Sequence, residues 1–148
     1  MSDILKYAPE SHRDLLRATL TATLTTIDAE GRPRSRAVWY FIDIDGQLKG
    51  STYSDLQQYK DLRRDPNCAL LIIDFGHPVL RTLEVRATAE LTADPDSSTV
   101  RKLADKYGVD AARAPVSENR FTITYHPRRL VASQDWPEEV LFGQDAHE

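Results

Sequence analysis

Residues 31–66 contain the side chains with the clearest chemical potential in this sequence. Thr52, Ser54 and Asp55 stand at the start of a predicted helix, where free backbone N–H groups and nearby hydroxyls favour an anion. Arg36, on a preceding predicted strand, can offer a guanidinium that binds phosphate through two parallel hydrogen bonds. However, Ser54 and Asp55 are also common helix caps, and Arg36 suits an exposed strand position equally well. The residues alone leave both interpretations open.

Other kinds of chemistry find less support in the sequence. The single cysteine, Cys68, excludes an intrachain disulfide and a site built from several thiolates. Its apolar neighbours favour a small buried side chain rather than a nucleophile. Neither a Gly-x-Ser-x-Gly motif nor a Gly-rich phosphate loop is present. We therefore expect no metal site and no catalytic nucleophile, because the histidines are also far apart in the sequence: His12, His77, His126 and His147.

The elements that must position these residues are mainly strands. Runs of β-branched, aromatic or alternating apolar residues predict strands at 19–27, 35–44, 47–53, 67–75, 79–91, 120–125 and 130–133. Helical spacing predicts short helices at 9–18, 54–64 and 94–107. Asp45-Gly46 is a strong hairpin signal, and Ala37–Ile42 is apolar enough to be buried on both faces. The pattern predicts a mostly β protein, a six- to seven-stranded antiparallel barrel or sandwich, rather than a Rossmann fold.

Composition restricts the class of protein. The chain has 148 residues, of which 41% are hydrophobic and 28% charged, with a net charge of −4. These values predict a single globular domain over residues 1–148, with a core at about 10–133 and an acidic tail at 134–148. The acidic balance argues against nucleic acid as a partner. We expect a cytoplasmic protein, because no apolar segment resembles a signal peptide or a membrane span.

Several short motifs occur together in the order seen in one known family. They are Gly31-Arg-Pro33, Arg36-x-Val38-Trp39-Tyr40, Ser51-Thr52 and Leu62-Arg-Arg-Asp-Pro66. This combination resembles the pyridoxamine-phosphate-oxidase-like split β-barrel superfamily, and most nearly its branch that uses the deazaflavin coenzyme F-420. The similarity covers roughly residues 10–133. It implies an antiparallel split barrel of the FMN-binding type, assembled as a homodimer with cofactor sites at the subunit interface.

The resemblance also implies which residues contact the cofactor. Arg36 matches the arginine that binds the FMN phosphate in the oxidases. Val38 and Trp39 match the segment whose backbone faces the flavin ring. Ser51 and Thr52 match the start of the phosphate loop. No catalytic side chain is implied.

This sequence departs from the family pattern at important positions. Where the family commonly has a phosphate-binding lysine, this chain has Gln58, and the nearby Lys60 lies half a helical turn away. Asp61 replaces the usual asparagine, and Ala87 the usual glycine. We still expect phosphate binding through Arg36, Gln58 and Lys60, unless the cofactor site has been lost. The substrate motif of pyridoxamine phosphate oxidase itself is absent, which argues against that activity.

The expected function follows from the resemblance. The first hypothesis is an oxidoreductase that uses reduced F-420 to transfer a hydride to an unsaturated small molecule, with FMN as the alternative cofactor. The second is a non-catalytic dimer that binds a flavin, deazaflavin or tetrapyrrole, and the missing lysine keeps this open. The third is a dimer that retains only the scaffold, without a cofactor.

Overall fold

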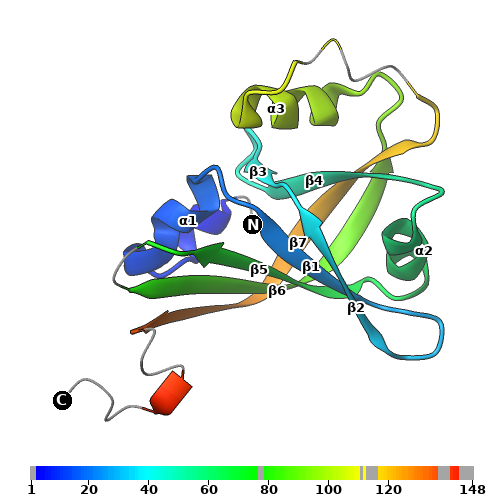
Figure 1. Cartoon of the computed structure of the whole chain (residues 1–148). Coiled ribbons are helices and arrows are strands. Elements are labelled where there is room, and N and C mark those ends of the chain that lie inside the picture. The colour runs from blue at the N-terminus through cyan, green and yellow to red at the C-terminus, as the bar shows by residue number, and fades with distance from the viewer. Residues whose placement is uncertain (1–2, 77–78, 111, 113–116, 137–140, 144–148) are drawn as a thin grey trace.

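A curled β-sheet forms the body of the protein. The computed structural model describes residues 3–76, 79–110, 112, 117–136 and 141–143. Within these residues the antiparallel strands lie in the order β2-β1-β5-β6-β7-β4-β3, and the sheet closes into a barrel (Figure 1). This confirms the predicted mostly β split barrel. The strands are β1 (Ala22–Ile27), β2 (Pro33–Val38), β3 (Phe41–Ile42), β4 (Leu48–Tyr53), β5 (Asn67–Asp74), β6 (Leu80–Ala93) and β7 (Arg120–Asp135).

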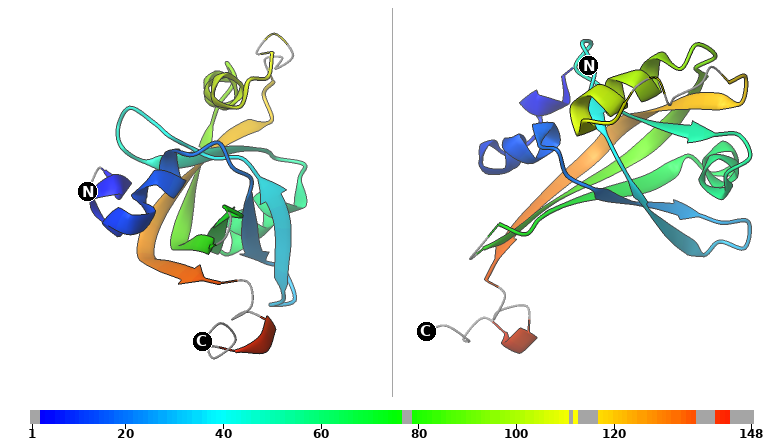
Figure 2. Two further views of the ribbon diagram at one scale, coloured as in Figure 1. Left: turned by 60° about the vertical axis from the view of Figure 1, so that its left-hand side comes forward. Right: turned by 45° about the horizontal axis from the view of Figure 1, so that its top comes forward.

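Short helices are inserted between these strands. The predicted N-terminal helix is a 3-10 turn, Glu10–His12, followed by α1 (Arg13–Arg17). Helix α2 (Gln57–Arg64) connects β4 to β5, and α3 (Ser98–Tyr107) connects β6 to the segment before β7. Figure 2 shows that α3 lies outside the barrel wall, beside β3 and β4. Most of the predicted acidic tail lies outside the described residues.

The prediction of one strand over 35–44, buried on both faces at Ala37–Ile42, is wrong. The chain leaves the sheet after Val38 and re-enters it as β3 at Phe41. β2 and β3 occupy the two opposite ends of the sheet order, so Trp39 and Tyr40 cross the gap between its edges. Tyr40 is buried, but Trp39 is 41% exposed. The apolar run therefore closes the barrel instead of forming a central strand.

The prediction of two separate C-terminal strands is also wrong. β7 is continuous from Arg120 to Asp135 and pairs with β6 along its length. The register shifts because Ala87 pairs with Pro127 while Arg86 pairs with Arg129. A β-bulge of this kind accommodates an extra residue without ending the strand. The proline and arginines that suggested a break thus mark a bulge.

The barrel interior holds the hydrophobic core. Alternate residues of β1, β5 and β6 point inward, which places Leu24, Leu70 and Val85 at 1% exposure or less. Leu15 and Leu16 of α1 belong to the same buried core. The core therefore fixes the strand register, and with it the faces on which the polar residues of β2 and β4 lie.

Candidate cofactor site

A cavity of about 450 Å³ lies where β2, β4, α2 and α3 meet. This volume falls in the range of small-molecule and cofactor sites. Arg36 and Val38 pair with Leu24 and Ala22, two core-facing residues of β1, and this register aims their side chains at the cavity side of β2. The lining residues are Thr21, Arg36, Ala37, Val38, Trp39, Ser51, Thr52, Tyr53, Leu56, Gln58, Val100, Leu103, Ala104, Val109, Asp110 and Arg120.

The corner between β4 and α2 carries buried polar groups. Thr52 and Gln58 are 2% and 6% exposed, and the Gln58 amide Nε2 donates to Thr52 Oγ1 at 2.9 Å. Because Thr52 Oγ1 accepts this bond, its own hydrogen remains available to another acceptor. Ser51 Oγ and Gln58 Oε1 are buried without a partner among the described residues. Such atoms are costly when unpaired, so this corner fits a polar ligand.

The start of α2 differs from the sequence prediction. The helix begins at Gln57, preceded by Leu56, which makes no side-chain cap. Ser54 and Asp55 lie before it, and the Ser54 backbone N–H donates to the Asn119 carbonyl at 2.8 Å. This bond ties the loop to the segment before β7 and delays the helix. Neither Ser54 nor Asp55 lines the cavity. Of the three residues predicted to form the anion site at the helix start, Thr52 is the one that lines it.

Asp61 fixes α2 against β1 and β2. Its side chain is fully buried and accepts from Thr26 Oγ1 and Arg34 Nε, both at 2.9 Å, and from Gln57 and Arg64. Burial raises the pKa of this carboxyl, but the hydrogen bonds outweigh it and hold the pKa below the usual value. The replacement of the family's asparagine by Asp61 therefore has a structural account: both carboxylate oxygens accept from donors here and carry the charge that pairs with Arg34 and Arg64, whereas an amide has one acceptor oxygen and no charge.

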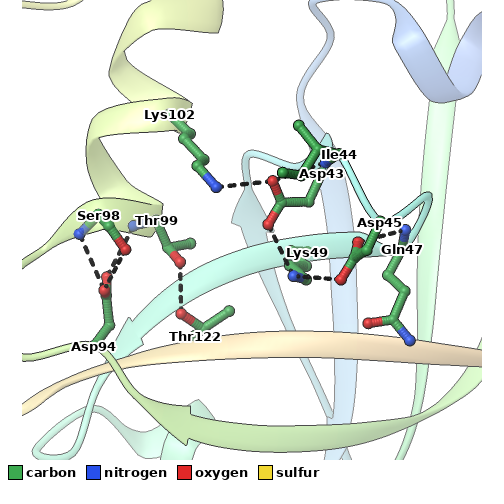
Figure 3. Close-up of polar contacts among 10 residues, drawn as sticks. All are labelled: Asp43, Ile44, Asp45, Gln47, Lys49, Asp94, Ser98, Thr99, Lys102 and Thr122. Carbon is green, nitrogen blue, oxygen red and sulfur yellow. Dashed lines mark hydrogen bonds and ion pairs between the residues drawn. The ribbon is translucent and has the colours of Figure 1, made fainter.

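Helix α3 covers the cavity with an apolar face and is anchored at several points (Figure 3). The Asp94 carboxylate accepts the backbone N–H groups of Ser98 and Thr99 at 3.0 and 3.1 Å. Further along, Lys102 Nζ contacts Asp43 Oδ1 at 2.8 Å, and Asp43 also accepts from Lys49. Burial raises the pKa of Asp43, but these bonds prevail and lower it to about 2. The helix begins at Ser98 and not at the predicted position 94, and the Asp94 side chain accepts its first N–H groups from the preceding segment.

The C-terminal end of α3 holds the crossing segment between β2 and β3. Trp39 stacks on Tyr107 with ring centroids 4.2 Å apart. Lys106 Nζ lies 4.0 Å from the Tyr40 ring centroid and donates to the Tyr40 carbonyl at 2.8 Å. Burial lowers the pKa of Lys106 to about 8. These contacts keep the exposed indole of Trp39 in the cavity wall.

Arg120 is the site residue that sequence reasoning missed. It is the first residue of β7, pairs with Tyr53, and is 4% exposed. Its guanidinium lies 4.2 Å from the Tyr53 ring centroid and donates to the Tyr53 hydroxyl. The alternating pattern at 120–125 predicted the strand, but a charged residue at a strand end gives no signal of burial. Only the pairing with β4 reveals that it faces the cavity.

Six of the seven residues predicted to contact a cofactor line this single cavity: Arg36, Val38, Trp39, Ser51, Thr52 and Gln58. Lys60 is exposed on α2 and is not among the lining residues. The geometry therefore gives no support to Lys60 as a ligand.

The remaining sequence expectations concern metals, thiols and membranes. No group of three or more His, Cys, Asp or Glu within the described ranges is arranged to hold a metal ion; His77 and His147 lie outside those ranges. Burial raises the pKa of the Cys68 thiol to about 12, so the thiolate is disfavoured. Among the helices described, none is long and apolar enough to span a membrane.

Comparison with known proteins identifies the family. The sequence model described as pyridoxamine 5'-phosphate oxidase matches residues 8–133. The chain belongs to this family. One solved structure, an F420 reductase, is 28% identical to this chain in sequence and has a TM-score of 0.72. The match covers 84% of this chain and 98% of the reductase. No curated protein matches this chain.

Two further solved structures resemble this chain in fold. A conserved hypothetical protein from Mycobacterium tuberculosis is 26% identical, with a TM-score of 0.71 over 87% of this chain and 84% of that protein. A haem storage protein from Vibrio cholerae is 13% identical, with a TM-score of 0.65 over 85% of this chain and 92% of its own. The similarity to the haem storage protein concerns the fold alone.

Proposed function

We propose that this protein is an oxidoreductase that binds the deazaflavin coenzyme F-420 and reduces an unsaturated small molecule, with FMN as the alternative cofactor. The observation that carries the proposal is the convergence of Arg36, Trp39 and Thr52 on one cavity. Arg36 lies on β2, Thr52 on β4 and Trp39 on the segment between β2 and β3, and all three match the family's cofactor contacts. The similarity to an F420 reductase over most of both chains supports the choice of F-420.

The chain's own residues would bind and orient the cofactor. The side chain of Arg36 is exposed and makes no hydrogen bond or ion pair with another described residue, so its guanidinium is available to a phosphate. The hydroxyl of Thr52, which accepts from Gln58, can donate its own hydrogen to the same anion. Bound F-420 or FMN in its reduced form supplies a hydride, so the protein need not supply a nucleophile.

The apolar wall would exclude water from the reacting centre. Val100, Leu103 and Ala104 of α3 face the cavity, and Val38 lines it from β2. A dry, preformed wall of this kind holds a planar ring and a small substrate in contact. The anchoring of α3 through Asp94 and Lys102 keeps this wall in place without help from a ligand.

Homodimer formation is the second part of the proposal. β2 is an edge strand, and its outward residue Ser35 is exposed. On β5, Leu71 and Ile73 alternate with buried Leu70 and Ile72 and remain partly exposed on the outer face of the barrel. A second copy would cover this outer face, as exposed edges and apolar sheet faces favour. Light scattering is expected to give about twice the 16.8 kDa chain mass, whereas a monomer would exclude a site at the subunit interface.

A titration with each cofactor tests the function. Binding of F-420 to the purified protein should change the coenzyme's fluorescence, and the loaded protein should oxidise reduced F-420 when an unsaturated acceptor is added. An FMN-dependent enzyme would instead bind FMN and turn yellow. Binding without turnover would favour the non-catalytic alternative, which the neutral Gln58 suggests. Binding of neither cofactor would leave only the scaffold.

A further inference from the structure

Arg120 is a buried cation that pairs with no anion among the described residues. It is 4% exposed, its Nε atom has no hydrogen-bond partner, and no carboxylate of the described residues lies within 4.0 Å of it. Its contacts are with Tyr53: the guanidinium lies over the ring, and Nη2 donates to the hydroxyl. A stacked ring offsets only part of the cost of removing a guanidinium from water. A buried charge normally has an ionic partner, so this one is prepared for a ligand.

The neighbouring carboxylates are already occupied or too distant. Asp94, whose backbone N–H donates to the Arg120 carbonyl at 2.9 Å, uses its side chain to cap α3. Asp55 accepts a long bond from Asn119 at 3.5 Å. Asp110 lines the cavity but does not reach Arg120. The charge of Arg120 is therefore available to an anionic ligand in the cavity.

The position of Arg120 relates directly to the departure at Gln58. Both side chains line the cavity at the end of β4, but from opposite faces of this strand: Gln58 contacts Thr52, and Arg120 contacts the next residue, Tyr53. An amide at position 58 brings hydrogen-bonding atoms but no charge. The described cations of the cavity are Arg36, which is exposed, and Arg120, which is buried. A buried cation binds an anion more strongly than an exposed one, because water and salt screen it less.

We propose that Arg120 is the principal phosphate-binding residue of this cavity and supplies the charge that Gln58 does not. The Nε–H group is the unpartnered donor, and the contact with Tyr53 fixes the orientation of the guanidinium. The identification of the anion as the cofactor's phosphate rests on the proposed function. The anion-binding property itself is independent of it.

Flavins with and without a phosphate measure this role. Wild-type protein is expected to bind FMN at least about tenfold more tightly than riboflavin, through one charge-assisted contact. The Arg120→Met variant should lose most of this preference for FMN, with its riboflavin affinity unchanged, because only the exposed Arg36 then remains to contact the phosphate. Arg101→Met, which removes an exposed arginine of α3 outside the cavity, should keep the wild-type ratio. An unchanged FMN preference in Arg120→Met would overturn the proposal.

Inorganic phosphate separates this proposal from the proposed function. Phosphate should raise the melting temperature of the wild-type protein but not that of Arg120→Met. If neither FMN nor F-420 binds while this difference remains, the proposed cofactor is wrong and the anion site stands. A wild-type protein without a phosphate response, or a response that persists in Arg120→Met, refutes Arg120 as the anchor.

Stability without ligand distinguishes a binding role from a structural one. Replacing an uncompensated buried cation by methionine should raise the melting temperature of the free protein, whereas loss of a purely structural arginine should lower it. Arg120→Gln provides a second variant that keeps a donor without the charge. It should fold like the wild type and lose the phosphate response. A retained response in a folded Arg120→Gln protein contradicts the proposal.

Discussion

Trp39 lies flat against Tyr107, with the ring planes 5° apart and the centroids separated by 4.2 Å. The Tyr107 hydroxyl donates to the Leu20 carbonyl at 2.6 Å, which links α3 to the segment before β1. The two rings thus join the barrel closure to the helix that covers the cavity. Because Trp39 is 41% exposed and lines the cavity, its indole should report directly on a bound ligand.

Tryptophan fluorescence can test whether Trp39 senses a bound ligand. The chain has two tryptophans, and Trp136 does not line the cavity. Addition of FMN or F-420 should quench the emission of Trp136→Phe, in which Trp39 remains. The Trp39→Phe variant should lose most of the quenching. Equal quenching in both variants would place the ligand away from the Trp39 side of the cavity.

Replacement of Arg36 should affect binding without affecting folding. The Arg36 side chain is exposed and has no described partner, so Arg36→Ala should leave the melting temperature nearly unchanged. Loss of one charge-assisted contact should weaken FMN binding about tenfold or more. Arg101→Ala serves as the matched control, since it removes an exposed arginine outside the cavity. Wild-type affinity in Arg36→Ala would exclude Arg36 as a ligand.

The sequence predicted the barrel and most of the candidate site because both depend on local patterns. Alternating apolar residues specify strands, and the motif containing Arg36 and Thr52 keeps its family spacing. The break at Trp39 was not predictable from the same pattern. An apolar segment that crosses between two sheet edges has the same sequence pattern as a buried strand, and only its pairing in the folded protein distinguishes the two.

Arg120 was missed for a related reason. Its burial arises because β7 pairs with the end of β4, some 70 residues earlier in the chain, and because Tyr53 covers it. Composition and spacing carry no information on that contact. Lys60 is the opposite case: its charge made it a candidate ligand, but its place on α2 leaves it exposed outside the cavity.

Asp61 should make stability depend on acid pH. Its pKa in the folded protein is below the ordinary value of 3.8, because hydrogen bonds from Thr26, Gln57, Arg34 and Arg64 overcome the effect of burial. Its contribution is therefore complete above about pH 4 and is lost as the pH falls through the lower, folded-state pKa. Asp61→Asn should lower the free energy of unfolding at pH 7 by about 1–3 kcal/mol.

Urea unfolding at pH 7 and pH 3 measures this contribution. The difference between wild type and Asp61→Asn should shrink at pH 3, because the wild-type carboxyl then loses part of its advantage. A difference that is the same at both pH values would show that the carboxylate charge does not stabilise α2.

Lys106 should produce a pH dependence in the alkaline range. Burial lowers its pKa from 10.5 to about 8, so the folded protein binds fewer protons than the unfolded chain between these values. The cost of burying the ammonium is complete below about pH 8 and disappears as the pH rises toward 10.5. The stability of Lys106→Met relative to wild type should therefore fall across this range. Unfolding measurements at pH 7 and 10 would show it, and a constant difference would indicate an ordinary lysine pKa.

The Gln58→Lys variant tests whether the cavity still accepts the family's arrangement of charge. Gln58 is 6% exposed and contacts Thr52, so a lysine at this position would be buried beside the cavity. Without ligand, the added ammonium should lower the melting temperature. With FMN it should tighten binding, and the gain should shrink at high salt to the extent that solvent reaches the pair.

The double variant Gln58→Lys with Arg120→Met gives the decisive comparison. If Arg120 replaces the missing lysine, a cation restored at position 58 should recover much of the FMN preference over riboflavin that Arg120→Met loses. The two substitutions should then be strongly non-additive, as expected for groups that share one ligand. Dissociation constants for FMN and riboflavin with the wild type, both single variants and the double variant complete the cycle. Strict additivity, with no recovery of the FMN preference, would mean that positions 58 and 120 do not serve the same phosphate.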